Sequence, residues 1–160
     1  MKKITFAAAA LCGAALAAQA QVTVKHIQTE KSPIASGVWA GDTFYLSGQL
    51  ASPVTPADQA KGTPADYGDT KTQTASIFTK IQAALREQGL DMKDVVKMTV
   101  FLVADPKTSK LDFPGLQASY TQFFGTKDQP NKPARSAVQV AALVSPTALA
   151  EIEVIAVRAK

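Results

Sequence analysis

The chain has 160 residues with 17 basic and 13 acidic side chains, which gives a formal net charge of +4. Its basic residues form no run and are not interleaved with aromatic ones, so the electrostatic footprint of a nucleic-acid-binding protein is missing. The only cysteine is Cys12, near the N-terminus, and the only histidine is His26. A single histidine makes a poor metal site. A Ser-His-Asp triad would have to use His26, and the sequence contains no Gly-x-Ser-x-Gly motif to accompany it, so a serine hydrolase is disfavoured.

The first 20 residues have the layout of a secretory signal peptide. Two lysines precede an apolar, alanine-rich stretch over residues 4–18, and small residues flank the expected cleavage site after Ala20. This stretch is shorter than the roughly 20 residues that span a bilayer. We therefore expect a signal peptide over residues 1–20 and one domain over 21–160 in a bacterial periplasm or outside the cell, with no membrane attachment after cleavage.

Cleavage would change the composition of the working protein. It would remove Lys2 and Lys3 and no acidic residue, so the net charge would fall from +4 to +2. It would also remove Cys12, which excludes disulfides, thiolate metal ligands and a cysteine nucleophile in the mature chain. A lipoprotein anchored through Cys12 is a weaker alternative, because Leu11 stands before it where a small residue is needed.

Five segments after the signal predict β-strands, because each is β-branched or alternates in polarity and is bounded by turn residues. They are residues 22–28, 43–48, 95–103, 135–141 and 151–157. Strand 95–103 carries apolar residues on both faces: we place Val96, Met98, Val100 and Leu102 on one, and Val95, Thr99, Phe101 and Val103 on the other with Lys97 as the only charge.

Two helical patterns interrupt the strands. The first has an apolar stripe from Ile77 to Leu85, a possible capping box in Thr70-x-x-Gln73, and Gly89 as its stop. The second begins near Asp112, has Pro114 in its first turn, and ends at Gly125. Its buried stripe consists of Leu116, Tyr120, Phe123 and Phe124.

The order of these elements belongs to the α+β class, with both helices on one face of a mixed sheet. Residues 51–69 separate the early strands from the first helix and are expected to form a long surface loop. Because the strand over residues 95–103 looks buried on both faces, we expect the face without helices to pack against other copies in a closed homo-oligomer.

Seven stretches in order carry a resemblance to a known family. They are GDTFYLSGQ at 41–49, QT at 73–74, GL at 89–90, DVVKMTVFL at 94–102, YTQFF at 120–124, PARSAVQV at 133–140 and EIEVIAV at 151–157. Together they resemble the RidA/YjgF family, once called the L-PSP endoribonuclease family. The resemblance implies a chorismate-mutase-like fold and a homotrimer whose sheets line a central barrel, with clefts between subunits. It also implies hydrolysis of 2-imino acids to 2-oxo acids and ammonia, with no metal or organic cofactor.

Arg135 is the candidate for holding the substrate. A 2-imino acid has a carboxylate beside an electrophilic C=N carbon, and a planar guanidinium suits that carboxylate. Strand alternation places Arg135 on the same face as Ala137 and Gln139. An arginine in an ion pair between subunits is the alternative that the residues alone leave open.

Glu151 and Glu153 are the candidates for positioning water, because either carboxylate can accept a proton. Alternation puts both on one strand face, and the residues alone do not separate them. A solvated strand edge is the ordinary fate of both. The resemblance selects Glu151 as the catalytic partner of Arg135.

Ser47, Gly48 and Gln117 are the expected substrate-binding residues. Gly48 would let backbone approach a ligand, and the hydroxyl of Ser47 would receive a substrate oxygen. Gln117 stands where family members commonly have asparagine, Ile34 stands where many have a tyrosine, and Ala137 replaces a frequent cysteine.

Those replacements leave other functions open. One alternative is a trimer that binds small carboxylates, or acts as a chaperone-like scaffold, without turnover. The retention of Arg135 and Glu151 opposes that alternative, and the loss of the tyrosine at position 34 favours it. An endoribonuclease would need a basic track long enough for RNA, which the sequence does not contain. We therefore expect no nucleic-acid partner.

Overall fold

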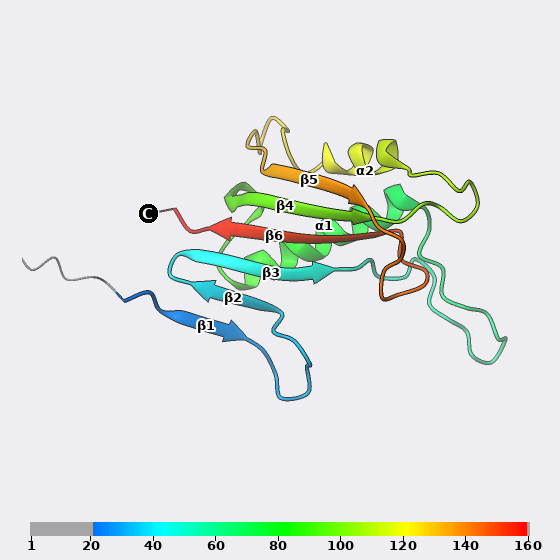
Figure 1. The fold of residues 1–160 in the computed structure, drawn as a ribbon, viewed down its shortest axis with the longest axis horizontal. Coiled ribbons are helices and arrows are strands. Elements are labelled where there is room, and N and C mark those ends of the chain that lie inside the picture. The colour runs from blue at the N-terminus through cyan, green and yellow to red at the C-terminus, as the bar shows by residue number, and fades with distance from the viewer. Residues whose placement is uncertain (1–20, 160) are drawn as a thin grey trace, which may run out of the picture.

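The computed structural model describes residues 21–159, so the predicted signal peptide lies outside the described residues. The described part forms one mixed sheet with two α-helices and a short 3-10 helix, η1 (Figure 1). In chain order the elements are β1 (Val24–Ile27), β2 (Gly37–Ala40), β3 (Thr43–Gln49), α1 (Thr70–Glu87), η1 (Met92–Asp94), β4 (Val95–Leu102), α2 (Phe113–Tyr120), β5 (Ala134–Gln139) and β6 (Ala150–Val157).

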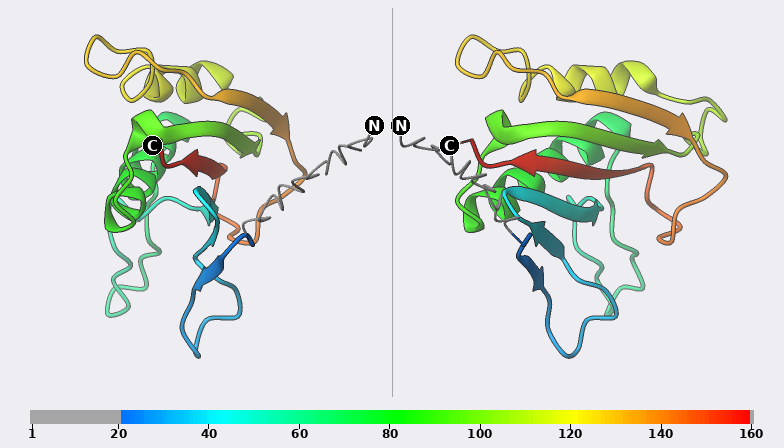
Figure 2. Two further views of the ribbon diagram at one scale, coloured as in Figure 1. Left: turned by 90° about the vertical axis from the view of Figure 1, so that its left-hand side faces the viewer. Right: turned by 60° about the vertical axis from the view of Figure 1, so that its left-hand side comes forward.

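The strands lie side by side in the order β1-β2-β3-β6-β4-β5. β4 and β5 run parallel, and the other neighbouring pairs are antiparallel. Both helices cover the same face of this sheet and leave the other face open, as the turned views in Figure 2 show. The predicted α+β class, with two helices on one face of a mixed sheet, is therefore confirmed.

Helix α1 forms the centre of the core. Its stripe of Ile77, Phe78, Ile81 and Leu85 is fully buried against the sheet, as the helical spacing predicts. Gly89 follows the helix with φ of +73°, which confirms the predicted stop. The predicted capping box is wrong, because the N-cap is Asp69, whose carboxylate accepts a hydrogen bond from the Thr72 amide at 2.8 Å.

Gln73, the other half of that predicted box, has a different structural role. Its side chain is buried and donates hydrogen bonds to the carbonyls of Gly68 and Thr147. Its amide oxygen accepts from the backbone N–H of Leu149 at 2.9 Å. Gln73 thus joins the start of α1 to the segment before β6, which satisfies backbone groups that would otherwise be buried without partners.

Strand β2 is the element that the sequence pattern did not predict. It is short, and its four residues alternate between buried and half-buried positions. Trp39 lies on its core side, 8% exposed, with its ring centroid 5.0 Å from that of Phe44. Trp39 is therefore a core aromatic, whereas Tyr45 in β3 is 46% exposed on the open face.

Two further predictions need correction. Strand β4 has a register shift between Val95 and Lys97, so the core face carries Val95 and Met98 while Val96 is 47% exposed. Simple alternation had placed Val96 on the same face as Met98, and the bulge puts Val95 on that face instead. Helix α2 ends at Tyr120 rather than Gly125, although Phe124 still stacks on Tyr120 with ring centroids 5.0 Å apart.

The predicted surface loop over residues 51–69 folds back on itself. Thr55 pairs with Asp66 and Asp58 pairs with Thr63, so the segment resembles an irregular hairpin. It extends away from the sheet beyond the end of β3 (Figure 1). No helix between residues 21 and 159 combines the length and the apolar character needed to cross a bilayer.

Candidate functional site

Arg135 projects from β5 toward helix α2. Its Nη2 donates a hydrogen bond to the Oε1 atom of Gln117 at 3.0 Å. Its guanidinium carbon lies 4.3 Å from the ring centroid of Tyr120 and 5.7 Å from that of Phe113. The guanidinium is thus held between an amide and two aromatic rings on the helix-covered side of the sheet, where cation–π contacts add to the hydrogen bond.

The charge on Arg135 has no counter-charge within the described residues. None of the ion pairs between residues 21 and 159 involves Arg135, and its Nη1 is buried with no hydrogen-bond partner there. A buried charged donor that lacks a partner is costly in free energy. Such a group is expected to gain strongly from an anionic ligand, and a carboxylate matches its planar geometry.

Tyr120 supplies a neutral ring beside this cation. Burial raises the pKa of the Tyr120 phenol above its ordinary value, and the neighbouring positive charge of Arg135 opposes that rise. The phenol is therefore protonated at neutral pH, so Tyr120 does not act as the missing anion. Its contribution to the site is the face of its ring.

Gln117, Phe113 and Tyr120 reach Arg135 from one face of α2, because positions i, i+4 and i+7 of a helix lie together. Asp112 caps this helix by accepting a hydrogen bond from the Gly115 amide at 2.9 Å. Of these three residues, the sequence predicted a site role only for Gln117, whereas it placed Tyr120 in the buried stripe of the helix. The helical spacing of Phe113 and Tyr120 from Gln117 was the available signal.

Glu151 lies on the opposite, open face of the sheet. It alternates along β6 with the buried residues Ala150 and Ile152, and Glu153 shares its face, as alternation predicted. A Cβ atom built on Gly48 would overlap the carboxylate of Glu151. The pairing of β3 with β6 also shifts register between Leu46 and Gln49. Glycine at position 48 thus makes room for the Glu151 side chain against β3.

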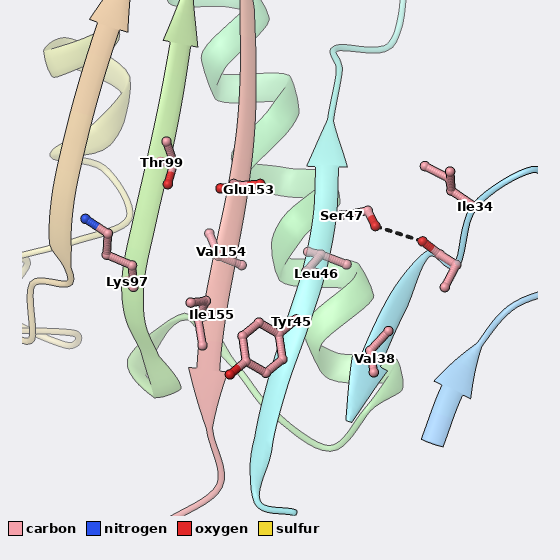
Figure 3. A pocket seen from close by; sticks show the side chains of 11 residues that line it. Ile34, Val38, Tyr45, Leu46, Ser47, Lys97, Thr99, Glu153, Val154 and Ile155 are labelled. Atoms are coloured by element: carbon pink, nitrogen blue, oxygen red, sulfur yellow. Dashed lines mark hydrogen bonds between the residues drawn. The ribbon is translucent and has the colours of Figure 1, made fainter. Parts of the chain in front are cut away.

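Ser47 lies beside this pair, and its hydroxyl donates a hydrogen bond to the carbonyl oxygen of Ala35 at 2.7 Å. While that bond is made, Oγ can act only as an acceptor toward a ligand. Ser47 therefore ties the segment that carries Ile34 to β3. Figure 3 shows this bond, with Ile34 on the far side of it from β6.

A groove of 390 Å³ crosses the open face next to Ser47. We call it the open-face groove. Apolar side chains from Ile34, Val38, Tyr45 and Ile155 line one part, and Lys97, Thr99 and Glu153 line the part over β4 and β6 (Figure 3). Lys97 donates a hydrogen bond to the hydroxyl of Ser136 at 2.9 Å, which extends this polar strip to β5.

The predicted site residues therefore fall into two groups within one chain. Arg135 and Gln117 lie together on the helix-covered face, while Glu151, Gly48 and Ser47 lie together on the open face. The sheet separates the two groups, so one chain does not bring Arg135 and Glu151 to a common ligand. Within residues 21–159, no three histidine, aspartate or glutamate side chains gather closely enough to hold a metal ion.

Together, the fold and site within residues 21–159 define an α+β protein with a one-sided helical layer. Arg135 and Glu151 lie on opposite faces of its sheet, and neither forms an ion pair within this range. Residues 25–158 match the family model described as Endoribonuclease L-PSP. A RutC family protein of Haemophilus influenzae is 39% identical over 137 residues, which cover 82% of this chain and 95% of that protein.

Two further similarities extend this result. The Escherichia coli protein named "Putative reactive intermediate deaminase TdcF" is 38% identical over 139 residues, covering 84% of this chain and 97% of that protein. The crystal structure of yeast Mmf1 is 30% identical with a TM-score of 0.64, and the match covers 86% of this chain and 100% of that chain. The chain belongs to the RidA/YjgF family, whose model carries the L-PSP endoribonuclease description.

Proposed function

We propose that this protein hydrolyses reactive 2-imino acids to 2-oxo acids and ammonia, at a site shared between neighbouring copies of a homotrimer. The observation that carries the proposal is the Arg135 guanidinium, which is partly buried, held in place and without a counter-charge among the described residues. A deaminase of this kind must hold a carboxylate next to the imine carbon. The name of the TdcF relative supports the same reaction class.

In this reaction Arg135 binds the substrate carboxylate, and Glu151 accepts a proton from a water molecule as the water oxygen attacks the imine carbon. The same proton then passes to the nitrogen, which gives a carbinolamine. Glu151 next takes the hydroxyl proton and delivers it to the nitrogen, so the C–N bond breaks as the C=O bond forms, and ammonia leaves a 2-oxo acid. Glu151 is suited to this role because Gly48 makes room for its carboxylate and no residue among 21–159 forms an ion pair with it. Ser47 holds the adjoining segment in place.

The proposed trimer accounts for the separation of the two groups. If the open face of one copy meets the β5 edge of the next, the Glu151 group of the first can face the Arg135 group of the second. Exposed apolar side chains on the open face support such an interface, since Tyr45 and Val138 are each 46% exposed. Closed symmetry would repeat the shared site at each interface.

We propose that the protein works outside the cytoplasm after cleavage of residues 1–20. The support is the charged, apolar and small-residue layout of that segment. N-terminal sequencing of the exported protein would test this directly. A first residue at Gln21 agrees with the proposal, and an intact Met1 in the exported fraction contradicts it.

The position of Ile34 favours a second candidate function, namely carboxylate binding without turnover. Ile34 is 65% exposed at the apolar part of the open-face groove. It precedes Ala35, whose carbonyl accepts the hydrogen bond from Ser47. An aliphatic side chain there cannot donate or accept the proton that a phenol would exchange with substrate or water. The proposed deaminase must therefore rely on Glu151 alone for proton transfer.

The deciding experiment is hydrolysis of freshly generated 2-iminopropanoate by residues 21–160, beside the variant Arg135→Ala. We expect the wild-type chain to accelerate loss of the imine and Arg135→Ala to lower kcat/KM at least about a hundredfold, or about 2.7 kcal/mol. Equal background rates for both proteins would reject the deaminase. If the wild-type chain then bound 2-oxopropanoate and Arg135→Ala did not, the result would support carboxylate binding without turnover.

A further inference from the structure

The amide that holds Arg135 is neutral, and we infer that this neutrality is its function. We propose that Gln117 is a positioning residue that fixes the Arg135 guanidinium without cancelling its charge, and so reserves that charge for an anionic ligand. The inference rests on the proposed function, because it assumes that Arg135 binds the ligand carboxylate. The inference goes beyond the proposed function because it makes Gln117, which acts through Arg135, a determinant of the affinity for the anion.

The hydrogen bond defines how the Gln117 amide is oriented. An arginine side chain can only donate hydrogen bonds, so the partner atom at 3.0 Å must be the amide oxygen of Gln117. The Gln117 Nε2 group is therefore turned away from Arg135, and no other hydrogen bond of this side chain is formed within residues 21–159. One side chain thus accepts from the guanidinium and keeps two N–H donors for other groups.

The charge at this position controls what Arg135 can bind. A glutamate side chain has nearly the same shape as glutamine but carries a negative charge, and at 3.0 Å it would form an ion pair with Arg135. A ligand carboxylate would then have to compete with that ion pair and meet the repulsion of a like charge. A neutral acceptor restrains the guanidinium and leaves the positive charge uncancelled.

Helix α2 is well suited to hold the amide at a constant position. Ser119, two residues after Gln117, is buried and donates a hydrogen bond to the Lys71 carbonyl of α1 at 2.7 Å. The Asp112 cap fixes the start of the helix. On the other side, the Tyr120 ring limits rotation of the guanidinium at 4.3 Å. Fixed partners reduce the ordering that a ligand must impose when it binds.

The test measures binding of 2-oxopropanoate, the product carboxylate, by calorimetry to residues 21–160 and to three variants. Arg135→Ala should abolish binding. Gln117→Leu, which keeps the bulk and loses the acceptor, should weaken it about three- to tenfold, as expected when one hydrogen bond of ordinary net strength no longer restrains the guanidinium. Gln117→Glu should weaken it more, by about thirtyfold or greater at pH 8.

The effect of Gln117→Glu should also depend on pH in one direction. A carboxylate beside Arg135 has a pKa below the ordinary glutamate value, so it stays charged until the solution is acidic. Lowering the pH toward that lowered pKa, within the range in which the variant stays folded, should therefore bring the affinity of Gln117→Glu back toward that of wild type at the same pH. A merely structural role for Gln117 would produce no such recovery. Circular dichroism of each variant checks that the fold is kept.

The outcomes separate this inference from the proposed function. If wild type does not bind 2-oxopropanoate, or if Arg135→Ala binds it equally well, the anion site itself is rejected. If Arg135→Ala loses binding while Gln117→Glu binds as tightly as wild type at pH 8, the anion site stands and the inference about Gln117 is overturned. A loss with Gln117→Glu that is the same at every pH also overturns it.

Discussion

Arg135 and Glu151 lie on opposite faces of one sheet, and their surroundings differ. Around Arg135 the chain supplies a hydrogen-bond acceptor, two aromatic rings and a capped helix. Around Glu151 the chain supplies space through Gly48, while the open-face groove beside Ser47 is lined by Glu153. The Arg135 group is already packed within the subunit, whereas Glu151 faces the side of the sheet opposite α1 and α2 (Figure 2).

This difference indicates separate roles for the two faces. A packed, restrained cation is suited to binding, because little ordering remains when the ligand arrives. In the proposed trimer, the carboxylate of Glu151 would be shielded from bulk water only where a second copy covers the open face. Changes near Arg135 should therefore act mainly on KM, and changes near Glu151 mainly on kcat.

The largest effect should come from a charge placed on the open face, at a residue that makes none of the hydrogen bonds or ring contacts of Arg135. Val138→Glu in β5 would introduce a carboxylate where Val138 is 46% exposed and expected to meet a second copy. Burying that charge between copies is costly, so the assembly should dissociate and the rate should fall to that of the uncatalysed reaction. Light scattering and imine hydrolysis measure the two results on one sample.

The matched control for Val138→Glu is Val54→Glu, since Val54 is 60% exposed in the hairpin-like segment. This variant introduces the same charge on a surface that the proposed interface does not use. It should keep both assembly and activity. Dissociation of both variants would contradict a specific interface on the open face. Activity in a monomeric Val138→Glu protein would contradict a site shared between copies.

Glu151→Gln should lower kcat about a hundredfold while leaving KM within about threefold, the usual scale for loss of a general base. The amide has nearly the shape of the carboxylate and fits the same space above Gly48. Steady-state kinetics with 2-iminopropanoate provides the measurement, and Glu153→Gln on the same strand face is the control. If Glu153→Gln caused the larger loss, the assignment of the two glutamates would be reversed.

Gly48→Ala should have a smaller effect, about a tenfold loss in kcat, because its Cβ would displace the Glu151 carboxylate without removing it. Ser47→Ala is the neighbouring control and removes only the hydrogen bond to Ala35. We expect the control to alter KM more than kcat through movement of the Ile34 segment. Unchanged kcat in Gly48→Ala would mean that the position of Glu151 is not critical.

The smallest effect should come from Tyr120→Phe, because no hydrogen bond of the phenol is formed within residues 21–159 and the ring under Arg135 remains. Activity should change by less than about twofold. Burial raises the pKa of the Tyr120 phenol. The contribution of the neutral phenol to the free energy of unfolding is therefore present below about pH 10 and is lost as pH rises through the raised pKa.

Chemical denaturation of Tyr120→Phe at pH 8 to 11 should therefore give a flatter dependence of stability on pH than in wild type. The comparison uses the free energy of unfolding of both proteins under the same conditions. An equally steep decline in the variant would assign the alkaline loss of stability to other groups. A large loss of activity in Tyr120→Phe would show that the phenol itself takes part in the reaction.

Much of the fold could be predicted from local pattern. The stripe of Ile77, Phe78, Ile81 and Leu85 specified α1, and Gly89 its end. The pattern was weaker for β2, since a four-residue strand is too short for alternation to be distinctive. It was misleading at Val96, because a bulge depends on the pairing of β4 with β6 and leaves no local signature.

The candidate site shows the same limit. Alternation placed Glu151 and Glu153 on one face, and the structure keeps them there. The contacts of Arg135 with Gln117 and Tyr120 join residues of β5 and α2, so they depend on how the helix packs. Arg135 lies on the face that the helices cover, and Glu151 lies on the other face. The alternation within a single strand does not show which of its two faces the helices cover, so this difference could not be predicted.

The most direct test of a site shared between copies is subunit complementation. Arg135→Ala and Glu151→Gln, each inactive alone, are unfolded together in equal amounts and refolded, and imine hydrolysis is compared with that of the two proteins mixed after folding. Random assembly should give an intact Arg135 facing an intact Glu151 at about a quarter of the interfaces, and so about a quarter of wild-type activity. No recovery in mixed trimers would contradict a shared site, because both residues would then have to come from one chain.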